Sequence, residues 1–154
     1  MLQSAQSLEA KNVAASILLK EVGVQPCADL QALFWTDEAS NIEWVIGYTA
    51  FIGKTCQMHM VNLKGGYTPK GLLFGAFDYP FNHCGLEKVF GIVNSKNVKA
   101  MEYDQKLGFT EALRFEGMHD DEGDLVVLQM GKADCRWIKE RKKWDITQNV
   151  SYTH

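Results

Sequence analysis

Residues 89–109 read VFGIVNSKNVKAMEYDQKLGF, and this stretch decides the fold of the whole chain. Its first five residues form a short apolar run that is typical of a buried strand. Asn94 or Ser95 can then cap a helix that carries apolar side chains at helical spacing and ends at Gly108. Phe109 can fold back on the last turn of that helix, as happens after a left-handed glycine cap. The stretch therefore predicts a buried strand followed directly by a capped helix.

The sequence before this stretch alternates between helical and extended apolar patterns. Apolar residues first recur at intervals of three and four, and runs rich in aromatic and β-branched residues follow. These patterns predict a helix over about 4–22 and strands over 30–36, 42–51 and 55–63. A second helix should begin at Thr68 and Pro69, with the threonine hydroxyl as its cap and proline at its first position. Pro80 should end or kink that helix around residues 78–81.

The sequence after this stretch completes an α/β pattern. Two strands over about 112–117 and 125–130 flank the acidic loop 119–124 and form a second hairpin. A short basic helix is predicted over 136–144, and residues 145–154 have the composition of a flexible tail. Because a strand, a crossover helix and a strand follow one another in the middle of the chain, one pair of strands must be parallel. The fold predicted is a mixed central sheet flanked by helices.

The composition limits the classes of protein to which the chain can belong. With 154 residues, 46% of them apolar and 23% charged, it should fold as one globular domain over about residues 1–144. Sixteen basic and nineteen acidic residues give a net charge of −3, which argues against a nucleic-acid binder. We find no secretory signal, and no apolar run approaches the roughly 18 residues that span a bilayer.

The four cysteines predict neither disulfides nor a zinc site. They lie 29, 28 and 51 residues apart, without a Cys-x-x-Cys pair or a matching histidine pair. We therefore expect four reduced thiols, no bound metal and a cytoplasmic location.

Asn97 and Ala100 form an N-x-x-A motif at the start of the predicted helix, and Gly108-Phe109 follows eight residues later. A buried strand that leads into such a helix resembles the GNAT N-acetyltransferase superfamily. The order of elements over about 30–130 is similar to that of its small single-domain members. The resemblance implies a sheet that is splayed between its two parallel strands, with acetyl-coenzyme A (acetyl-CoA) in the gap. Diverging strands leave backbone groups free for the pantetheine arm, and a helix N-terminus favours the pyrophosphate.

The turn before the second predicted helix is where the resemblance places the phosphate-binding cradle. Lys64, Tyr67 and Pro69 stand at its three motif positions, so both glycines typical of the family are replaced. The pair Gly65 and Gly66 can restore a close backbone approach, and nearby lysines can add positive charge. The implied cofactor contacts are Met60 and Val61, through a backbone N–H on the acetyl oxygen, and Lys64, Gly65, Gly66, Tyr67, Thr68, Lys70 and Asn97.

Acetyl transfer to an amine also needs groups that move protons. His59 is the predicted general base, because an imidazole titrates near neutral pH and the residue lies mid-strand beside the implied thioester. Glu43 is the alternative base. Members of the family commonly protonate the departing thiolate with a tyrosine seven residues after the motif asparagine, where this chain has Asp104. The adjacent Tyr103 is the predicted general acid.

The resemblance therefore implies an N-acetyltransferase that passes an acetyl group from acetyl-CoA directly to a primary amine on a small molecule or a protein. The replaced glycines and the shifted tyrosine leave open an alternative, a catalytically weak or inactive module that binds acyl-CoA or another protein. The acidic loop is either a solvated turn or an attractor of cationic amines. The basic helix either packs on the domain or mediates self-association, which would give a homodimer. No nucleic-acid or membrane partner is expected.

Overall fold

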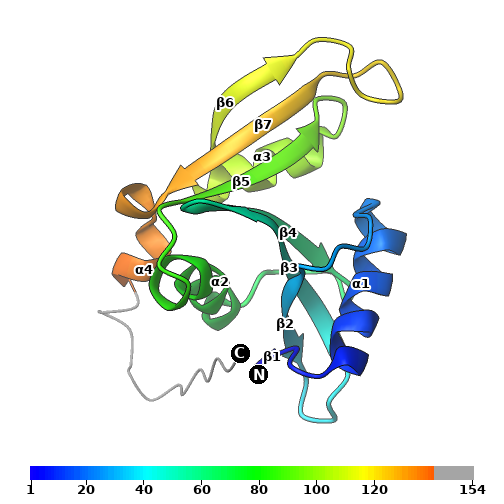
Figure 1. The fold of residues 1–154 in the computed structure, drawn as a ribbon, viewed down its shortest axis with the longest axis vertical. Coiled ribbons are helices and arrows are strands. Elements are labelled where there is room, and N and C mark those ends of the chain that lie inside the picture. The colour runs from blue at the N-terminus through cyan, green and yellow to red at the C-terminus, as the bar shows by residue number, and fades with distance from the viewer. Residues whose placement is uncertain (141–154) are drawn as a thin grey trace.

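The computed structural model describes residues 1–140, which form a seven-stranded sheet with helices on both faces (Figure 1). The strands are β1 (Leu2–Ser4), β2 (Gln31–Thr36), β3 (Ile42–Ile52), β4 (Thr55–Asn62), β5 (Lys88–Asn94), β6 (Thr110–Phe115) and β7 (Leu125–Gly131). The helices are α1 (Leu8–Val22), α2 (Lys70–Asp78), α3 (Val98–Leu107) and α4 (Arg136–Glu140). A π-helical turn follows α2 over Tyr79–His83, and a 3-10 turn follows β7 over Lys132–Asp134.

The order of strands across the sheet is β1-β2-β3-β4-β5-β7-β6. Neighbouring strands in the described sheet are antiparallel except β4 and β5, which are parallel and are joined by the crossover that contains α2. The predicted mixed sheet is therefore confirmed. The second hairpin is also present, although β6 begins two residues earlier than predicted. None of the described helices is long and apolar enough to cross a bilayer.

β4 and β5 are paired over only three residues. The pairs are Thr55 with Lys88, Cys56 with Val89, and Gln57 with Phe90. Beyond these pairs β4 continues along β3 as far as Asn62, whereas β5 continues along β7 as far as Asn94. Figure 1 shows the two strands side by side at one end and apart at the other. The splay that the sequence resemblance implies is therefore present.

Side chains that alternate along the central strands divide the core between the two faces of the sheet. On β3, Trp44, Ile46 and Tyr48 belong to the cluster that packs with α2, whereas Val45 belongs to the cluster that packs with α1. Tyr48 is fully buried, and its hydroxyl donates a 2.5 Å hydrogen bond to the Ala76 carbonyl of α2. Burial of each such side chain stabilises the fold by roughly 1.5–3 kcal/mol, and this packing holds α2 against the first half of the sheet.

α1 is shorter than the helix predicted over 4–22, because residues Leu2–Ser4 form the edge strand β1. Ser7 caps α1, since its hydroxyl accepts a hydrogen bond from the Ala10 N–H at 3.0 Å. Gly23 ends the helix with a φ of +70°, in the left-handed region that glycine adopts without strain. The prediction was wrong at its start because a three-residue strand has no periodicity and forms only through its pairing with β2.

α2 begins at Lys70, and Pro69 takes its N-cap position rather than its first helical position. No side chain caps this helix, so the predicted cap by Thr68 is wrong. The Thr68 hydroxyl bonds to a side chain of α3 instead. The other end is as predicted, because α2 stops at Asp78 and Pro80 lies in the π-helical turn.

α4 packs against α2 and α3, which lie on the same side of the sheet. Trp137 is buried, its Nε1–H donates to the Leu107 carbonyl at 2.9 Å, and its ring lies 6.4 Å from that of Phe74 in α2. The predicted packing of the basic helix is confirmed for the part that is described. The rest of the helix predicted over 136–144, and the tail predicted over 145–154, lie outside the described residues.

Gly47 of β3 sets how closely α1 approaches the sheet, because a Cβ there would lie 2.5 Å from Leu18 Cδ1. Leu18 is fully buried, so it has little room to move. We expect Gly47→Ala to lower the free energy of unfolding by about 1–3 kcal/mol through overpacking. Urea unfolding at constant m-value measures the effect.

Gly91→Ala is the matched control, since no atom lies within 4 Å of a Cβ at Gly91 in β5. Its effect should stay within about 0.5 kcal/mol. Equal losses in the two variants would contradict the close packing of α1 on β3.

Candidate active site

The opening between β4 and β5 leaves two strand edges without a strand partner in the described sheet. On β4 the edge runs over residues 58–62, and on β5 over residues 91–94. Met60 and Val61, the predicted contacts of the acetyl group, lie in the β4 segment. Met60 is half-buried on the α2 side, whereas Val61 is buried on the α1 side. An extended ligand can bond to such edges in the way that an added strand would.

Asn62 organises the glycine turn that follows β4. Its Oδ1 accepts hydrogen bonds from the backbone N–H groups of Lys64, at 3.1 Å, and Gly65, at 2.9 Å. Its Nδ2 donates to the Gly66 carbonyl at 3.3 Å. Both glycines have a φ of +83°, which few other residues adopt. Two of the N–H groups that a phosphate cradle would offer are therefore used inside the turn, by a residue that sequence reasoning missed.

Glu43 and Lys64 form an ion pair across the first half of the sheet. The Lys64 Nζ lies 2.7 Å from the Glu43 Oε1, and the carboxylate is only 15% exposed. The contact with Glu43 raises the pKa of the Lys64 ammonium, so the lysine stays charged at neutral pH. This pairing leaves Glu43 poorly placed to act as the alternative base, because its carboxylate already accepts from a cation.

The N-terminus of α2 lies at the end of this turn. No side chain caps it and its first turn holds no acidic residue, so its N–H groups and the positive end of its dipole favour an anion. Lys70 is exposed at the first helical position, and the side chain of Tyr67 is entirely exposed three residues earlier. The helix end therefore fits a phosphate group, although the amides of Lys64 and Gly65 do not take part.

Thr68 and Tyr103 meet between α2 and α3. The two hydroxyl oxygens are 2.7 Å apart, and either one can donate. Burial raises the pKa of the Tyr103 phenol, and the charge of Asp104 adds to this, while the Thr68 bond acts in the opposite direction. The phenol is therefore neutral and carries its proton at pH 7. The contact joins residues 35 apart in the chain, so no local pattern predicts it.

Asp104, which occupies the position of the tyrosine typical of the family, is half-buried on α3. Burial raises the pKa of its carboxyl to about 6. The carboxyl is therefore largely ionised at pH 7, and a smaller fraction of it is protonated than of the Tyr103 phenol.

Among residues 1–140, no three His, Cys, Asp or Glu side chains are placed to hold a metal ion.

His59 lies on β4 just beyond the last pair with β5, on the face that α1 covers. Its Nε2 is 2.9 Å from the Thr49 hydroxyl of β3. Burial lowers the pKa of the imidazole to about 4, so the ring is neutral at pH 7. If Nε2 carries the hydrogen and donates to Thr49, then Nδ1 holds the lone pair that can accept a hydrogen bond.

Asn97 caps α3, since its Oδ1 accepts a hydrogen bond from the Ala100 N–H at 3.1 Å. The N-x-x-A motif thus has a structural basis in this chain. The predicted cap by Asn94 or Ser95 is wrong, because β5 extends to Asn94 and Ser95 bonds to Asp124. Asn97 is exposed and lies three residues beyond the end of β5.

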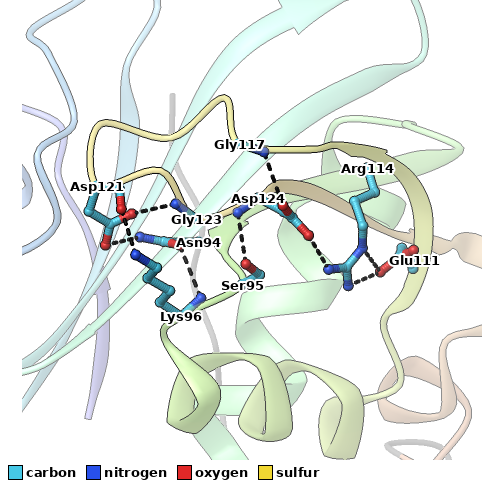
Figure 2. Close-up of polar contacts among 9 residues, drawn as sticks. All are labelled: Asn94, Ser95, Lys96, Glu111, Arg114, Gly117, Asp121, Gly123 and Asp124. Atoms are coloured by element: carbon cyan, nitrogen blue, oxygen red, sulfur yellow. Dashed lines mark hydrogen bonds and ion pairs between the residues drawn. The ribbon is translucent and has the colours of Figure 1, made fainter.

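The loop between β6 and β7 is fastened to the turn between β5 and α3 (Figure 2). Ser95 and Asp124 exchange two hydrogen bonds, from the Asp124 N–H to the Ser95 hydroxyl at 2.8 Å and from the Ser95 N–H to the Asp124 carbonyl at 2.9 Å. Asn94 Nδ2 donates to Asp121 Oδ2 at 2.8 Å, and Lys96 Nζ donates to the Asp121 carbonyl at 2.6 Å. Gly123 fits here because a Cβ would lie 2.1 Å from Asn94 Oδ1. The loop therefore braces one wall of the opening.

The same contacts occupy two of the acids in the predicted acidic loop. Hydrogen bonds to Gly123 and Asn94 lower the pKa of Asp121, and contacts with Arg114 and Gly117 lower that of Asp124. Both carboxylates are used within the protein. An attraction for cationic amines, if this loop has one, must come from its other acids.

No protein-family model matches the chain, and no curated protein matches it. Several solved structures are similar to it. A chimera of spermidine N-acetyltransferase SpeG from Vibrio cholerae and hSSAT is 15% identical and superposes with a TM-score of 0.70, over 90% of this chain and 99% of that one. The Vibrio cholerae enzyme in complex with CoA and spermine is 14% identical, with a TM-score of 0.66 over 87% and 96% of the two chains. At these identities the likeness shows the fold, so the chain has the GNAT N-acetyltransferase fold, as the sequence resemblance predicts.

The burial of His59 makes stability depend on pH. The unfolded imidazole has a pKa near 6.5 and the folded one about 4, so the unfolded state binds more protons between these values. The burial of His59 should therefore contribute a loss of about 2 kcal/mol between pH 7 and pH 5, part of which the raised carboxyl pKa of Asp104 offsets in the parent. Urea unfolding of the parent at both pH values measures the loss.

His59→Gln is the control that isolates this group. Asp104 has the opposite effect, because a raised carboxyl pKa stabilises the fold as the pH falls. The variant should therefore lose less stability on acidification than the parent by about 2 kcal/mol. The same pH dependence in both proteins would show that His59 is not buried as a neutral ring.

Proposed function

We propose that the protein is an N-acetyltransferase that moves an acetyl group from acetyl-CoA directly to a primary amine. The observation that carries this proposal is the opening between β4 and β5, which has an uncapped helix N-terminus at one wall and Tyr103 at the other. The likeness in fold to spermidine N-acetyltransferases, one of them in complex with CoA and spermine, supports it.

The pantetheine arm would lie along the free edges of β4 and β5, with the acetyl oxygen near the backbone N–H groups of Met60 or Val61. The phosphates would lie at the N-terminus of α2. Because Asn62 accepts from the N–H groups of Lys64 and Gly65, we expect Gly66, Tyr67 and Lys70 to make more of the contacts with the phosphates. Lys64 would add charge from its ion pair, and Thr68 and Asn97 remain proposed contacts.

The reaction needs no covalent enzyme intermediate. The amine nitrogen attacks the thioester carbonyl, the C–N bond forms and the C–S bond breaks, and the sulfur leaves with the electron pair. Tyr103 would supply a proton to that sulfur, since its phenol is neutral at pH 7. The neutral ring of His59 would accept a hydrogen bond from the incoming amine and so order it, or a water next to it.

The acceptor class is a primary amine on a small molecule or a protein. A polyamine is the first candidate, because the structural neighbours are spermidine N-acetyltransferases. We also propose that the protein is cytoplasmic and forms a homodimer. All four cysteines are unpaired, which fits a reducing compartment.

A second candidate is an acyl-CoA-binding module without turnover. The hydrogen bonds of Asn62 favour it, since they remove two N–H groups from the cradle. This candidate binds the cofactor and transfers nothing, so one pair of experiments separates the two.

Acetyl-CoA should raise the melting temperature, because a ligand that binds only the folded state stabilises it. At a concentration of 100 times its Kd, the gain is about 2.7 kcal/mol, or several degrees. Free CoA should act similarly and ADP less. The absence of a shift at millimolar acetyl-CoA would overturn both candidates. A shift without release of CoA thiol in the presence of spermidine and other primary amines would favour the module.

Tyr103→Phe tests the proposed general acid. Because the substitution removes only the hydroxyl, we expect kcat to fall roughly 100-fold while the melting-temperature shift with acetyl-CoA persists. Thiol release under saturating substrates measures kcat. An unchanged kcat would remove Tyr103 from the mechanism.

A further inference from the structure

The hydroxyl groups of Thr68 and Tyr103 join the two walls of the opening between β4 and β5. Thr68 lies two residues before α2, and Tyr103 lies in the middle of α3. Their oxygens are 2.7 Å apart, the usual length of a hydrogen bond between two hydroxyl groups. Both residues are half-buried, so water competes less for this bond than it would at the surface.

The Thr68 hydroxyl has no role in holding the helix that it precedes. Thr68 lies one residue before Pro69, which takes the N-cap position, and no side chain caps α2. The Thr68 hydroxyl is hydrogen-bonded to Tyr103 instead. The bond also fixes the orientation of Tyr103, which lies one residue before the position where the family commonly has its tyrosine. One residue turns a side chain by about 100° around a helix, and the contact with Thr68 fixes the Tyr103 hydroxyl on the side of α2.

We propose that Thr68 is a positioning residue for proton transfer, which holds the Tyr103 hydroxyl toward the departing sulfur and stabilises the phenolate left behind. This inference rests on the proposed acetyl transfer. It gives Thr68 a part in the chemistry beyond the contact with phosphate that the sequence resemblance implies.

When the C–N bond has formed and the C–S bond breaks, the Tyr103 proton passes to the sulfur and free CoA thiol results. The Thr68 hydroxyl keeps its own proton and turns it toward the phenolate oxygen, to which it donates a charge-assisted hydrogen bond. The proton lost by the amine leaves through water, and a proton from water restores the phenol. No further reactant is needed.

Thr68→Val and Thr68→Ser form the matched pair that tests this role. Valine removes the hydroxyl at nearly constant shape, whereas serine keeps it. We expect Thr68→Val to lower kcat about 10-fold with the KM of both substrates within about twofold, and Thr68→Ser to stay within about threefold of the parent kcat. Thr110→Val on exposed β6 is the control for a threonine-to-valine change outside the opening, and it should match the parent.

The background of Tyr103→Phe distinguishes positioning from a structural role. If Thr68 acts through Tyr103, then Thr68→Val should have no further effect on kcat once the phenol is absent. A tenfold loss in that background as well would overturn the proposal. So would a rise in the KM of acetyl-CoA at unchanged kcat, because Thr68 would then be a contact of the cofactor alone.

Two further readouts separate failure of this inference from failure of the proposed function. The melting temperature of Thr68→Val, with and without acetyl-CoA, shows that the variant is folded and binds the cofactor. If the parent releases thiol with an amine and Thr68→Val does so at the same rate, only the positioning role is wrong. If the parent binds acetyl-CoA and acetylates no amine, the proposed function and the positioning role are overturned together.

Discussion

The parallel contact between β4 and β5 stops after three residue pairs, and the rest of the structure depends on this limit. Each strand keeps its other neighbour, because β3 pairs with β4 up to Asn62 and β7 pairs with β5 up to Asn94. Tyr48 and Gly47 tie the first half of the sheet to α2 and α1. The β6–β7 loop ties the second half to the start of α3 through Ser95 and Asp124 (Figure 2). Each half of the sheet is thus braced by its own contacts, and the opening lies between the two halves.

The groups proposed to take part in the chemistry lie around the opening between β4 and β5. The α2 N-terminus, with its free positive end, follows the turn at the end of β4, and Tyr103 reaches it from the other side through Thr68. His59 lies on β4 with its ring neutral because it is buried. The two groups proposed for acid–base chemistry, a phenol and an imidazole, are thus both neutral. Charge lies instead at the turn, where Lys64 pairs with Glu43 and Lys70 begins α2.

Much of the fold was predictable because its signals are local. The apolar strand at Val89 and the stop at Gly108 are short patterns with direct physical causes, and the structure confirms both, whereas the cap of α3 lies at Asn97 and not at Asn94 or Ser95. The edge strand β1 was missed because it forms only through its partner β2. The cap assigned to Thr68 was wrong because α2 begins one residue later than predicted, with Pro69 at the N-cap, and the Thr68 hydroxyl bonds to Tyr103.

The site was predictable only in part, for the same reason. Sequence reasoning placed Met60 and Val61 on the strand segment that the structure leaves open. It did not find Asn62, whose side chain takes two N–H groups of the glycine turn, nor the pairing of Glu43 with Lys64. An asparagine before two glycines is an ordinary turn signal, and its exact hydrogen bonds depend on the turn geometry. The ion pair spans 21 residues and has no local pattern.

The central claim is that the free edges of β4 and β5 receive the pantetheine arm of acetyl-CoA. Hydrogen–deuterium exchange with and without acetyl-CoA tests it most directly, because new backbone hydrogen bonds slow the exchange of the amides that form them. We expect added protection in residues 58–62 of β4 and 91–94 of β5 and at the start of α2, with little change in β1 and β2. Protection confined to other segments, at saturating acetyl-CoA, would contradict it.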